Sequence, residues 1–162
     1  MHNAPLTYRK NVRPSDRERV AEIITSTGFF SREEVDIAVE LVHEQLEKGS
    51  DSGYLFLFAE QAGITVGYAC FGPIPGTLAS YDLYWIAVHA DSQRQGFGKE
   101  ILAQTETLIA GRKGTKVYVD TSSRQQYEPT RRFYQDCNYR PEAFLKDFYA
   151  PGDSKFIFVK DI

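Results

Sequence analysis

Residues 81–88 read Tyr-Asp-Leu-Tyr-Trp-Ile-Ala-Val, and after four further residues the chain continues at 93–99 as Gln-Arg-Gln-Gly-Phe-Gly-Lys. The first run is apolar at nearly every position, which predicts a strand buried on both faces in the centre of a sheet. The second run is a glycine-containing turn, and apolar side chains recur at helical spacing behind it, through residues 101–109. Strand, turn and helix in this order predict an α/β fold with a right-handed crossover to a parallel strand at residues 116–121.

The turn at residues 93–99 has the properties of an anion site. At a helix N-terminus the first amide N–H groups have no acceptor within the helix, and the macrodipole is positive there. Gly96 and Gly98 let the backbone come close to a phosphate, and Arg94 and Lys99 add positive charge. The turn matches neither the Walker phosphate loop nor the dinucleotide-binding pattern GxGxxG. From these residues alone, an ordinary exposed turn is the alternative.

The rest of the chain extends this pattern without a domain linker or an internal repeat. Two Ser-x-x-Glu patterns, at Ser15 with Glu18 and at Ser31 with Glu34, predict the capping boxes of two helices. We expect further strands over residues 6–12, 54–60, 64–71, 139–148 and 154–160, and a further helix over residues 129–137. The sequence therefore predicts one domain over residues 1–162.

Composition argues against several classes of protein. The formal charge is −3, from 19 Lys+Arg and 22 Asp+Glu, which does not favour the basic face that nucleic acid requires. No run approaches the ~20 apolar residues of a membrane span, and the first five residues lack the regions of a secretory signal. Cys70 and Cys137 lie far apart and outside any metal-ligand spacing, which predicts free thiols and no metal. We expect a cytoplasmic protein whose partner is neither nucleic acid nor a membrane.

Two spaced motifs resemble those of a known family. The residues from Gln93 to Gly98 form Q-x-x-G-x-G after a hydrophobic strand, which resembles the acetyl-CoA-binding signature of the GNAT superfamily of N-acyltransferases. Phe133-Tyr134, followed by Asn138-Tyr139, resembles that family's aromatic-Tyr-x-x-x-Gly-aromatic segment, with Asn in place of Gly. The resemblance covers essentially the full chain. It implies a mixed sheet of about seven strands, flanked by about four helices, in which the central parallel strands splay apart.

The resemblance also implies acetyl-CoA as cosubstrate, and it implies the residues that bind it. In such enzymes the pyrophosphate of CoA lies on the turn at 93–99, and the pantetheine arm pairs with the end of the preceding strand at 86–88. Tyr127 stands where many members have an Asn near the CoA arm. The implied cofactor-binding residues are Ile86, Ala87, Val88, Gln93, Arg94, Gln95, Gly96, Phe97, Gly98, Lys99 and Tyr127.

Acyl transfer to an amine needs a base and an acid, because an ammonium must lose its proton before it attacks and the departing thiolate must gain one. Asp82 matches the position of the catalytic carboxylate of some members, eleven residues before Gln93, although those members carry Glu. Tyr134 matches the family's usual general acid, which protonates the sulfur of CoA. A structural carboxylate at a strand end and a packing tyrosine are the alternatives for these two residues.

We therefore expect an enzyme that moves an acetyl group from acetyl-CoA directly to an amine of a small molecule or peptide, without a metal. By analogy with the family, Phe29 and Phe30 line the acceptor site. Two alternatives stay open: a non-catalytic domain that binds acyl-CoA, and an N-acetyltransferase that acts on a protein or an aminoacyl-tRNA. A homodimer could also form, because an edge strand or the C-terminal hairpin can pair between chains.

Overall fold

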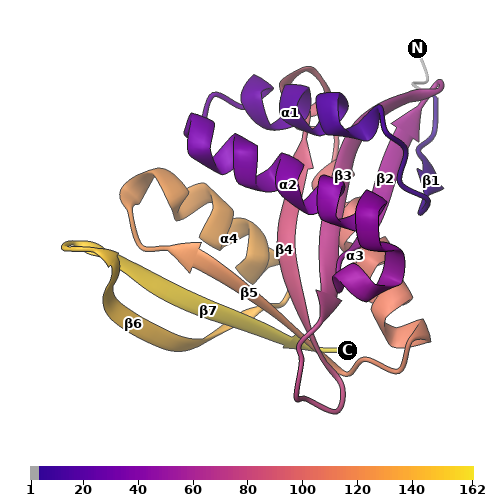
Figure 1. Ribbon diagram of the computed structural model, residues 1–162. Helices are drawn as coiled ribbons and strands as arrows, with labels where there is room; N and C mark the ends of the chain where they lie inside the picture. The colour runs from indigo at the N-terminus through magenta and orange to yellow at the C-terminus, as the bar shows by residue number, and fades with distance from the viewer. Residues whose placement is uncertain (1–3) are drawn as a thin grey trace. The chain divides into compact units, whose positions relative to one another are not determined.

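Seven strands and four α-helices make up the fold in residues 4–162, the part of the chain that the computed structural model describes (Figure 1). The strands form one mixed sheet in the order β1-β2-β3-β4-β5-β7-β6. The predicted α/β class is confirmed, with the predicted numbers of strands and helices. Met1 to Asn3, part of the stretch expected to lack a signal segment, lie outside the described residues.

The described chain divides into two compact units. Unit 1 runs to Gly72 and includes Trp85–Thr107, and unit 2 comprises Pro73–Tyr84 and Leu108–Ile162. Strand β4 (Ser80–Val88) therefore contributes its first half to unit 2 and its second half to unit 1. That the whole chain is one domain stays a prediction.

The elements of unit 1 precede and follow the first half of β4 along the chain. They are β1 (Thr7–Arg9), α1 (Asp16–Ser26), α2 (Arg32–Lys48), β2 (Leu55–Gln61), most of β3 (Ile64–Pro73) and most of α3 (Phe97–Gly111). Those of unit 2 are β5 (Lys116–Ser122), α4 (Glu128–Asp136), β6 (Arg140–Ala150) and β7 (Asp153–Asp161). Three short 3-10 turns complete the chain, at Gly49–Ser52, Ala90–Ser92 and Gln125–Tyr127.

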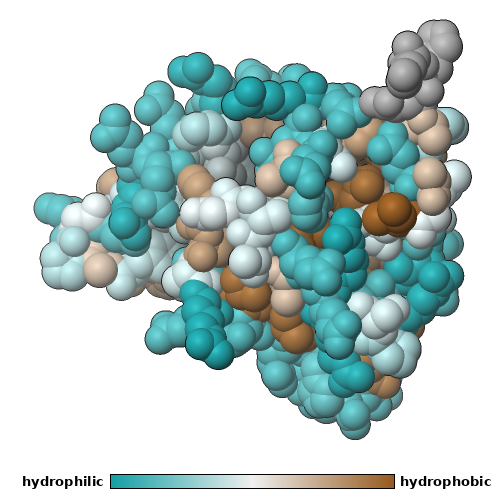
Figure 2. Space-filling view, turned by 90° about the horizontal axis from the view of Figure 1, so that it is seen from above, coloured by the Kyte–Doolittle hydropathy of each residue, from teal (hydrophilic) through white to brown (hydrophobic). Residues whose placement is uncertain are grey.

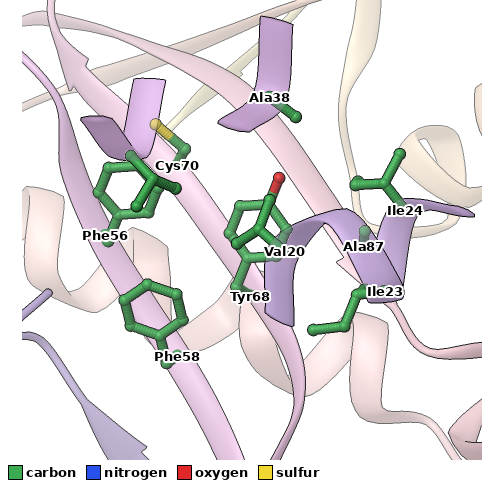
Figure 3. Close-up of a cluster of buried hydrophobic side chains, with 10 residues drawn as sticks. Val20, Ile23, Ile24, Ala38, Phe56, Phe58, Tyr68, Cys70 and Ala87 are labelled. Atoms are coloured by element: carbon green, nitrogen blue, oxygen red, sulfur yellow. The ribbon is translucent and has the colours of Figure 1, made fainter. Parts of the chain in front are cut away.

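The core of unit 1 lies between the helix pair α1–α2 and the hairpin β2–β3. Phe56, Phe58 and Tyr68 stack on one another from the two strands, and none of the three is more than 3% exposed (Figure 3). Val20, Ile23 and Ile24 from α1, and Ala38 and Val42 from α2, cover these rings. The helical spacing of those apolar residues is what buries one face of each helix.

The hairpin and the second helix form as their sequences predict. Gln61 pairs with Ile64, and the two residues between them, Ala62 and Gly63, have φ of 51° and 81°, as a type I′ turn requires. At the start of α2, Ser31 Oγ accepts from the Glu34 N–H while the Glu34 carboxylate accepts from the Ser31 N–H. The capping box predicted there is confirmed.

The capping box predicted at Ser15 is wrong. Ser15 has helical dihedral angles and makes no side-chain cap. The helix nevertheless begins at Asp16 with Ser15 as its N-cap residue. The Asp16 carboxylate is held by the preceding segment, because its Oδ2 accepts from the Arg13 N–H at 2.7 Å and its two oxygens accept from Arg9 at 2.8 Å.

Unit 2 is built around β5. This strand pairs antiparallel with β7 along its whole length, and β7 pairs with β6. It pairs parallel with β4 over Ser80–Asp82 alone, which confirms the predicted parallel crossover and the splay of these two strands. The prediction that β4 is buried on both faces is wrong in this half: Tyr81 and Leu83 are buried, whereas Tyr84 is 38% exposed.

Among the described residues, no helix is long and apolar enough to span a membrane. In the view from above, the surface is mainly hydrophilic, and hydrophobic residues reach it in separate small groups (Figure 2). Both cysteines are free thiols; Cys70 is buried and Cys137 partly so.

Candidate active site

The turn that the sequence singles out lies in unit 1, between β4 and α3. Gln93, Arg94, Gln95, Gly96 and Lys99 are exposed, and Phe97 and Gly98 are half-buried. Glu100 donates its N–H to the Gly96 carbonyl at 3.1 Å, so the N–H groups of Phe97, Gly98 and Lys99 precede the first bond of the helix. These amides, the helix dipole and two exposed cationic side chains form an arrangement suited to a phosphate.

Three hydrogen bonds anchor this turn to the rest of unit 1. Gln93 Nε2 donates to the Val88 carbonyl at 3.0 Å, which closes the turn back onto the end of β4. The N–H of His89 donates to the Val66 carbonyl on β3 at 2.8 Å, and the N–H of Ala90 donates to Ser26 Oγ at 3.0 Å. The last of these anchors could not be predicted, because Ser26 lies 64 residues away in sequence.

Two residues of the turn have positive φ, Arg94 and Gly96. Gly96 has φ of 81°, and a Cβ built there would meet nothing within 4 Å. Arg94 has φ of 64°, which is uncommon for a residue with a side chain. Space around Gly96 therefore stays open for a ligand, and the glycine is required by its dihedral angles rather than by crowding.

A close backbone approach fixes the end of β4 against β3. A Cβ on Gly67 would lie 2.8 Å from Ile101 Cδ1, 2.9 Å from the Ala87 carbonyl oxygen and 3.3 Å from Val88 Cγ2. Strand β3 therefore needs glycine at this position. Ile86, Ala87 and Val88, the segment predicted to pair with the pantetheine arm, thus lie on a strand that is held tightly along one edge.

Asp82 lies at the last paired position of β4 in unit 2. Its Cα partner on β5 is Tyr118, and the parallel pairing stops there. Burial raises the pKa of the Asp82 carboxyl, the negative charge of Asp120 raises it further, and Lys155 lowers it. A raised pKa makes this carboxylate a stronger base than an ordinary surface aspartate.

Tyr134 is buried on α4 in the core of unit 2, at 4% exposure. Its ring centroid lies 5.6 Å from that of Tyr139 and 6.2 Å from that of Phe158 on β7. Burial raises the pKa of Tyr134 above its ordinary value, and the nearby Cys137 adds to the shift. The hydroxyl therefore keeps its proton at neutral pH. Asn138, which replaces the glycine of the motif, takes φ of 69° just beyond the helix, as a C-cap residue does.

The two acceptor-site candidates belong to unit 1. Phe29 and Phe30 are both half-buried in the linker between α1 and α2, with ring centroids 5.4 Å apart. Phe30 also packs edge-on against Trp85 of β4 at 5.1 Å. Sequence reasoning missed Trp85 as the partner that covers this linker, because Trp85 lies 55 residues after Phe30 and their contact depends on the fold.

Tyr127, the remaining cofactor candidate, ends the 3-10 turn before α4 in unit 2 and is half-buried. Its N–H donates to the Arg124 carbonyl at 3.0 Å. The structure thus places Tyr127, Asp82 and Tyr134 in unit 2, and places the turn, the end of β4 and the two phenylalanines in unit 1. Within the described residues, no group of three or more His, Cys, Asp or Glu side chains is arranged to hold a metal ion.

A seven-stranded mixed sheet with a glycine-containing turn before α3 defines an α/β protein with a candidate anion-binding turn. A family model described as the acetyltransferase (GNAT) domain matches residues 52–141, more than half of the chain. The chain belongs to the GNAT acetyltransferase family.

Relatives and solved structures agree with this family. A GNAT-family protein from Desulfovibrio desulfuricans superposes with a TM-score of 0.95 at 42% identity, over 97% of this chain and 99% of that chain. The PaiA N-acetyltransferase from Thermoplasma acidophilum, solved in complex with coenzyme A, gives a TM-score of 0.74 at 19% identity, over 98% of this chain and 99% of that chain. The second of these shows the fold alone.

A curated relative adds a partial match in sequence. The uncharacterized N-acetyltransferase YuaI from Bacillus subtilis is 30% identical over 95 residues, which is 57% of this chain and 52% of that protein. The match therefore spans about half the length of that relative.

Proposed function

We propose that the protein transfers an acetyl group from acetyl-CoA to the nitrogen of an amine carried by a small molecule or a peptide. The exposed turn at residues 93–99 supplies the amides and the positive charges for the CoA pyrophosphate. The backbone of Ile86, Ala87 and Val88 pairs with the amide-bearing pantetheine arm as an added strand would. Tyr127, directly before α4, contacts the same cosubstrate.

In this proposal Asp82 removes the proton of the acceptor ammonium, directly or through a water, and the free amine attacks the thioester carbonyl carbon. A C–N bond forms and the C–S bond breaks, and the nitrogen releases its second ammonium proton to solvent, which leaves a neutral amide. Tyr134 gives its proton to the departing sulfur, and solvent returns the proton from Asp82 to Tyr134. Direct transfer needs no covalent intermediate on the enzyme, and Cys70 is too deeply buried to act as a nucleophile.

One observation supports the proposal most strongly: the pairing of β4 with β5 ends at Asp82. Beyond that residue the backbone of β4 leaves its parallel neighbour, so its N–H and C=O groups become available to a ligand with amide groups. The candidate base therefore stands where the paired region ends and the ligand-binding region begins. The aromatic linker with Phe29 and Phe30 suits an acceptor that is small or partly apolar.

The test is to incubate the purified chain with acetyl-CoA and pooled amines, and to follow both thiol release and the mass of the amine products. The pool contains polyamines, amino acids, aminoglycosides and short peptides, and acetyl-CoA without amine corrects for hydrolysis. Thiol release that depends on an amine, with a product heavier by one acetyl group on nitrogen, supports the proposal. Tight binding of acetyl-CoA with no turnover in any pool would favour a non-catalytic binding domain instead.

A further inference from the structure

The ammonium of Lys155 is held between two groups of unit 2 that the proposed function does not use. Its Nζ lies 2.8 Å from Asp120 Oδ2 on β5 and 4.3 Å from the centroid of the Phe148 ring on β6. The Lys155 side chain is 16% exposed, against 45% for Asp120. Exposed ion pairs leave both side chains flexible and contribute little. This lysine is fixed from two sides.

The irregular shape of β6 brings Phe148 over the lysine. The register between β6 and β7 shifts between Leu145 and Ala150, and Asp147 within this stretch has φ of 54°. The Asp147 N–H donates to Ser154 Oγ at 2.9 Å, and its carboxylate accepts from the Gly152 N–H at the same distance. These bonds stabilise an irregular stretch of β6, and the Phe148 ring of this stretch contacts the Lys155 ammonium.

The Lys155–Asp120 pair lies on the same face of the sheet as Asp82. Asp82 pairs with Tyr118, and Asp120 follows two residues later on β5, so the two carboxylates point to the same side. By strand alternation the titratable groups on this side of unit 2 include Tyr84 of β4, Lys116, Tyr118 and Asp120 of β5, and Asp153, Lys155 and Asp161 of β7. Burial raises the pKa of Tyr149 of β6, and the charges of Asp120 and Asp153 raise it further. Asp120 opposes ionisation of Asp82 and Lys155 favours it.

We propose that Lys155 is a positioning residue for acyl transfer: it pins the carboxylate of Asp120 and supplies the positive charge that lets Asp82 act as a carboxylate beside it. This inference rests on the proposed function, in which Asp82 accepts the proton of the acceptor. Lys155 fixes Asp120 and acts on Asp82 through its charge, and it does not touch the reacting atoms. Phe148 helps to keep Lys155 positively charged, because the face of an aromatic ring favours the charged form of an ammonium.

Three variants of the full chain test the inference: Lys155→Met, Lys155→Arg and Asp120→Asn. Two quantities are measured for each: the pH titration of the Asp82 side-chain carboxyl by carbon NMR, and the pH profile of acetyl transfer at saturating acetyl-CoA. Lys146→Met, which changes an exposed lysine of β6, is the matched control. Because Lys155→Met could perturb the fold, Asp120→Asn is an independent test, for which the expected shift in the titration of Asp82 has the opposite direction.

Lys155→Met should move the titration of Asp82 and the acidic limb of the rate profile to higher pH, which lowers the rate at pH 6 by about threefold or more and less at pH 8. Asp120→Asn should move both to lower pH. Lys155→Arg and Lys146→Met should leave both close to the wild type. Shifts of opposite sign for the two charge-removing variants support the proposal, because a merely structural role moves both in one direction.

An unchanged titration of Asp82 in both variants would overturn the role of Lys155, whatever the activity. Shifted titrations with an unmoved rate profile would instead overturn Asp82 as the base, which is the failure of the proposed function.

Discussion

Asp82 and Tyr134 lie on opposite faces of the sheet in unit 2. Asp82 shares its face with its partner Tyr118, whereas Tyr134 packs on Phe158, whose register partner Val119 points to the other side. In the proposed mechanism, a base and an acid on opposite faces require that the thioester pass through the sheet beyond Asp82, the last β4 residue that pairs with β5.

Replacing Tyr134 with Phe should lower kcat by about tenfold or more while the Kd of CoA changes by less than about twofold. The buried ring keeps its packing in this variant, so only the proton donor is lost. Steady-state rates and calorimetric binding of CoA measure the two effects. Phe133→Tyr on the adjacent, half-buried position is a control for packing. Equal losses of rate and affinity would assign Tyr134 to packing.

Asp82→Asn should abolish the acidic limb of the pH profile and lower the rate at pH 7. The folded-state pKa of Asp82 is raised, so its contribution to stability is present at low pH and is lost as pH rises through that pKa. The variant should therefore have a higher Tm than the wild type at pH 7 and an equal Tm near pH 3. A thermal unfolding series from pH 3 to 8 checks this. Stability that falls at every pH would show that the carboxylate has a structural role.

Gln93→Ala should weaken CoA binding about fivefold, since one hydrogen bond that holds the turn to Val88 is lost, while kcat changes little. Gln104→Ala, on the exposed face of α3, should leave both unchanged. Titration of CoA by fluorescence or calorimetry distinguishes them. If Gln93→Ala binds CoA as the wild type does, the turn keeps its shape without this bond.

Gly96→Ala and Arg94→Gly form a matched pair on the same turn. Both positions have positive φ, so alanine at 96 should cost about 1 kcal/mol of unfolding free energy, and glycine at 94 should cost little. Both should weaken CoA binding, the first through a reshaped backbone and the second through a lost charge. The affinity loss of Arg94→Gly should shrink in high salt, whereas that of Gly96→Ala should not. Urea unfolding and CoA titration at two salt concentrations provide the measurements.

Asp16→Ala should destabilise the fold by about 3 kcal/mol, because it leaves the Arg9 guanidinium buried without its main partner. The two side chains are 8% and 4% exposed. Ser15→Ala should change the unfolding free energy by less than about 0.5 kcal/mol, since Ser15 makes no side-chain cap, and Ser31→Ala should cost about 1 kcal/mol. A urea series on the three variants ranks them. A large effect at Ser15 would contradict the absence of a side-chain cap there.

The pattern of apolar residues and turns predicted most of the fold, because helices, strands and turns depend mainly on residues that are close in sequence. The glycine turn at residues 61–63, the capping box at Ser31 and the crossover after β4 all depend on short-range geometry. The capping box at Ser15 was wrong although the helix starts where it was expected, because Ser15 has helical dihedral angles and makes no side-chain cap. The exposure of Tyr84 on one face of β4 was not predicted, because a tyrosine side chain can lie either in the core or at the surface.

The candidate site was predictable where a motif carries it and not where distant residues support it. The turn is recognised from its residues, and Tyr134 from its match to the family's motif. Lys155, by contrast, appears as one charge on a C-terminal strand, and only the register of β5 with β7 shows that it pairs with Asp120 near Asp82. Supporting residues of this kind need the fold before they can be recognised.

The absence of a side chain at Gly67 lets β3 and the end of β4 in unit 1 approach more closely than any other residue would allow. A Cβ there would lie 2.9 Å from the Ala87 carbonyl oxygen and 3.3 Å from Val88 Cγ2, so the two strands leave no room for it. A larger residue at position 67 must therefore push the end of β4 away from β3. Its effect is expected to reach the segment proposed to pair with the pantetheine arm, although Gly67 itself lies on the neighbouring strand.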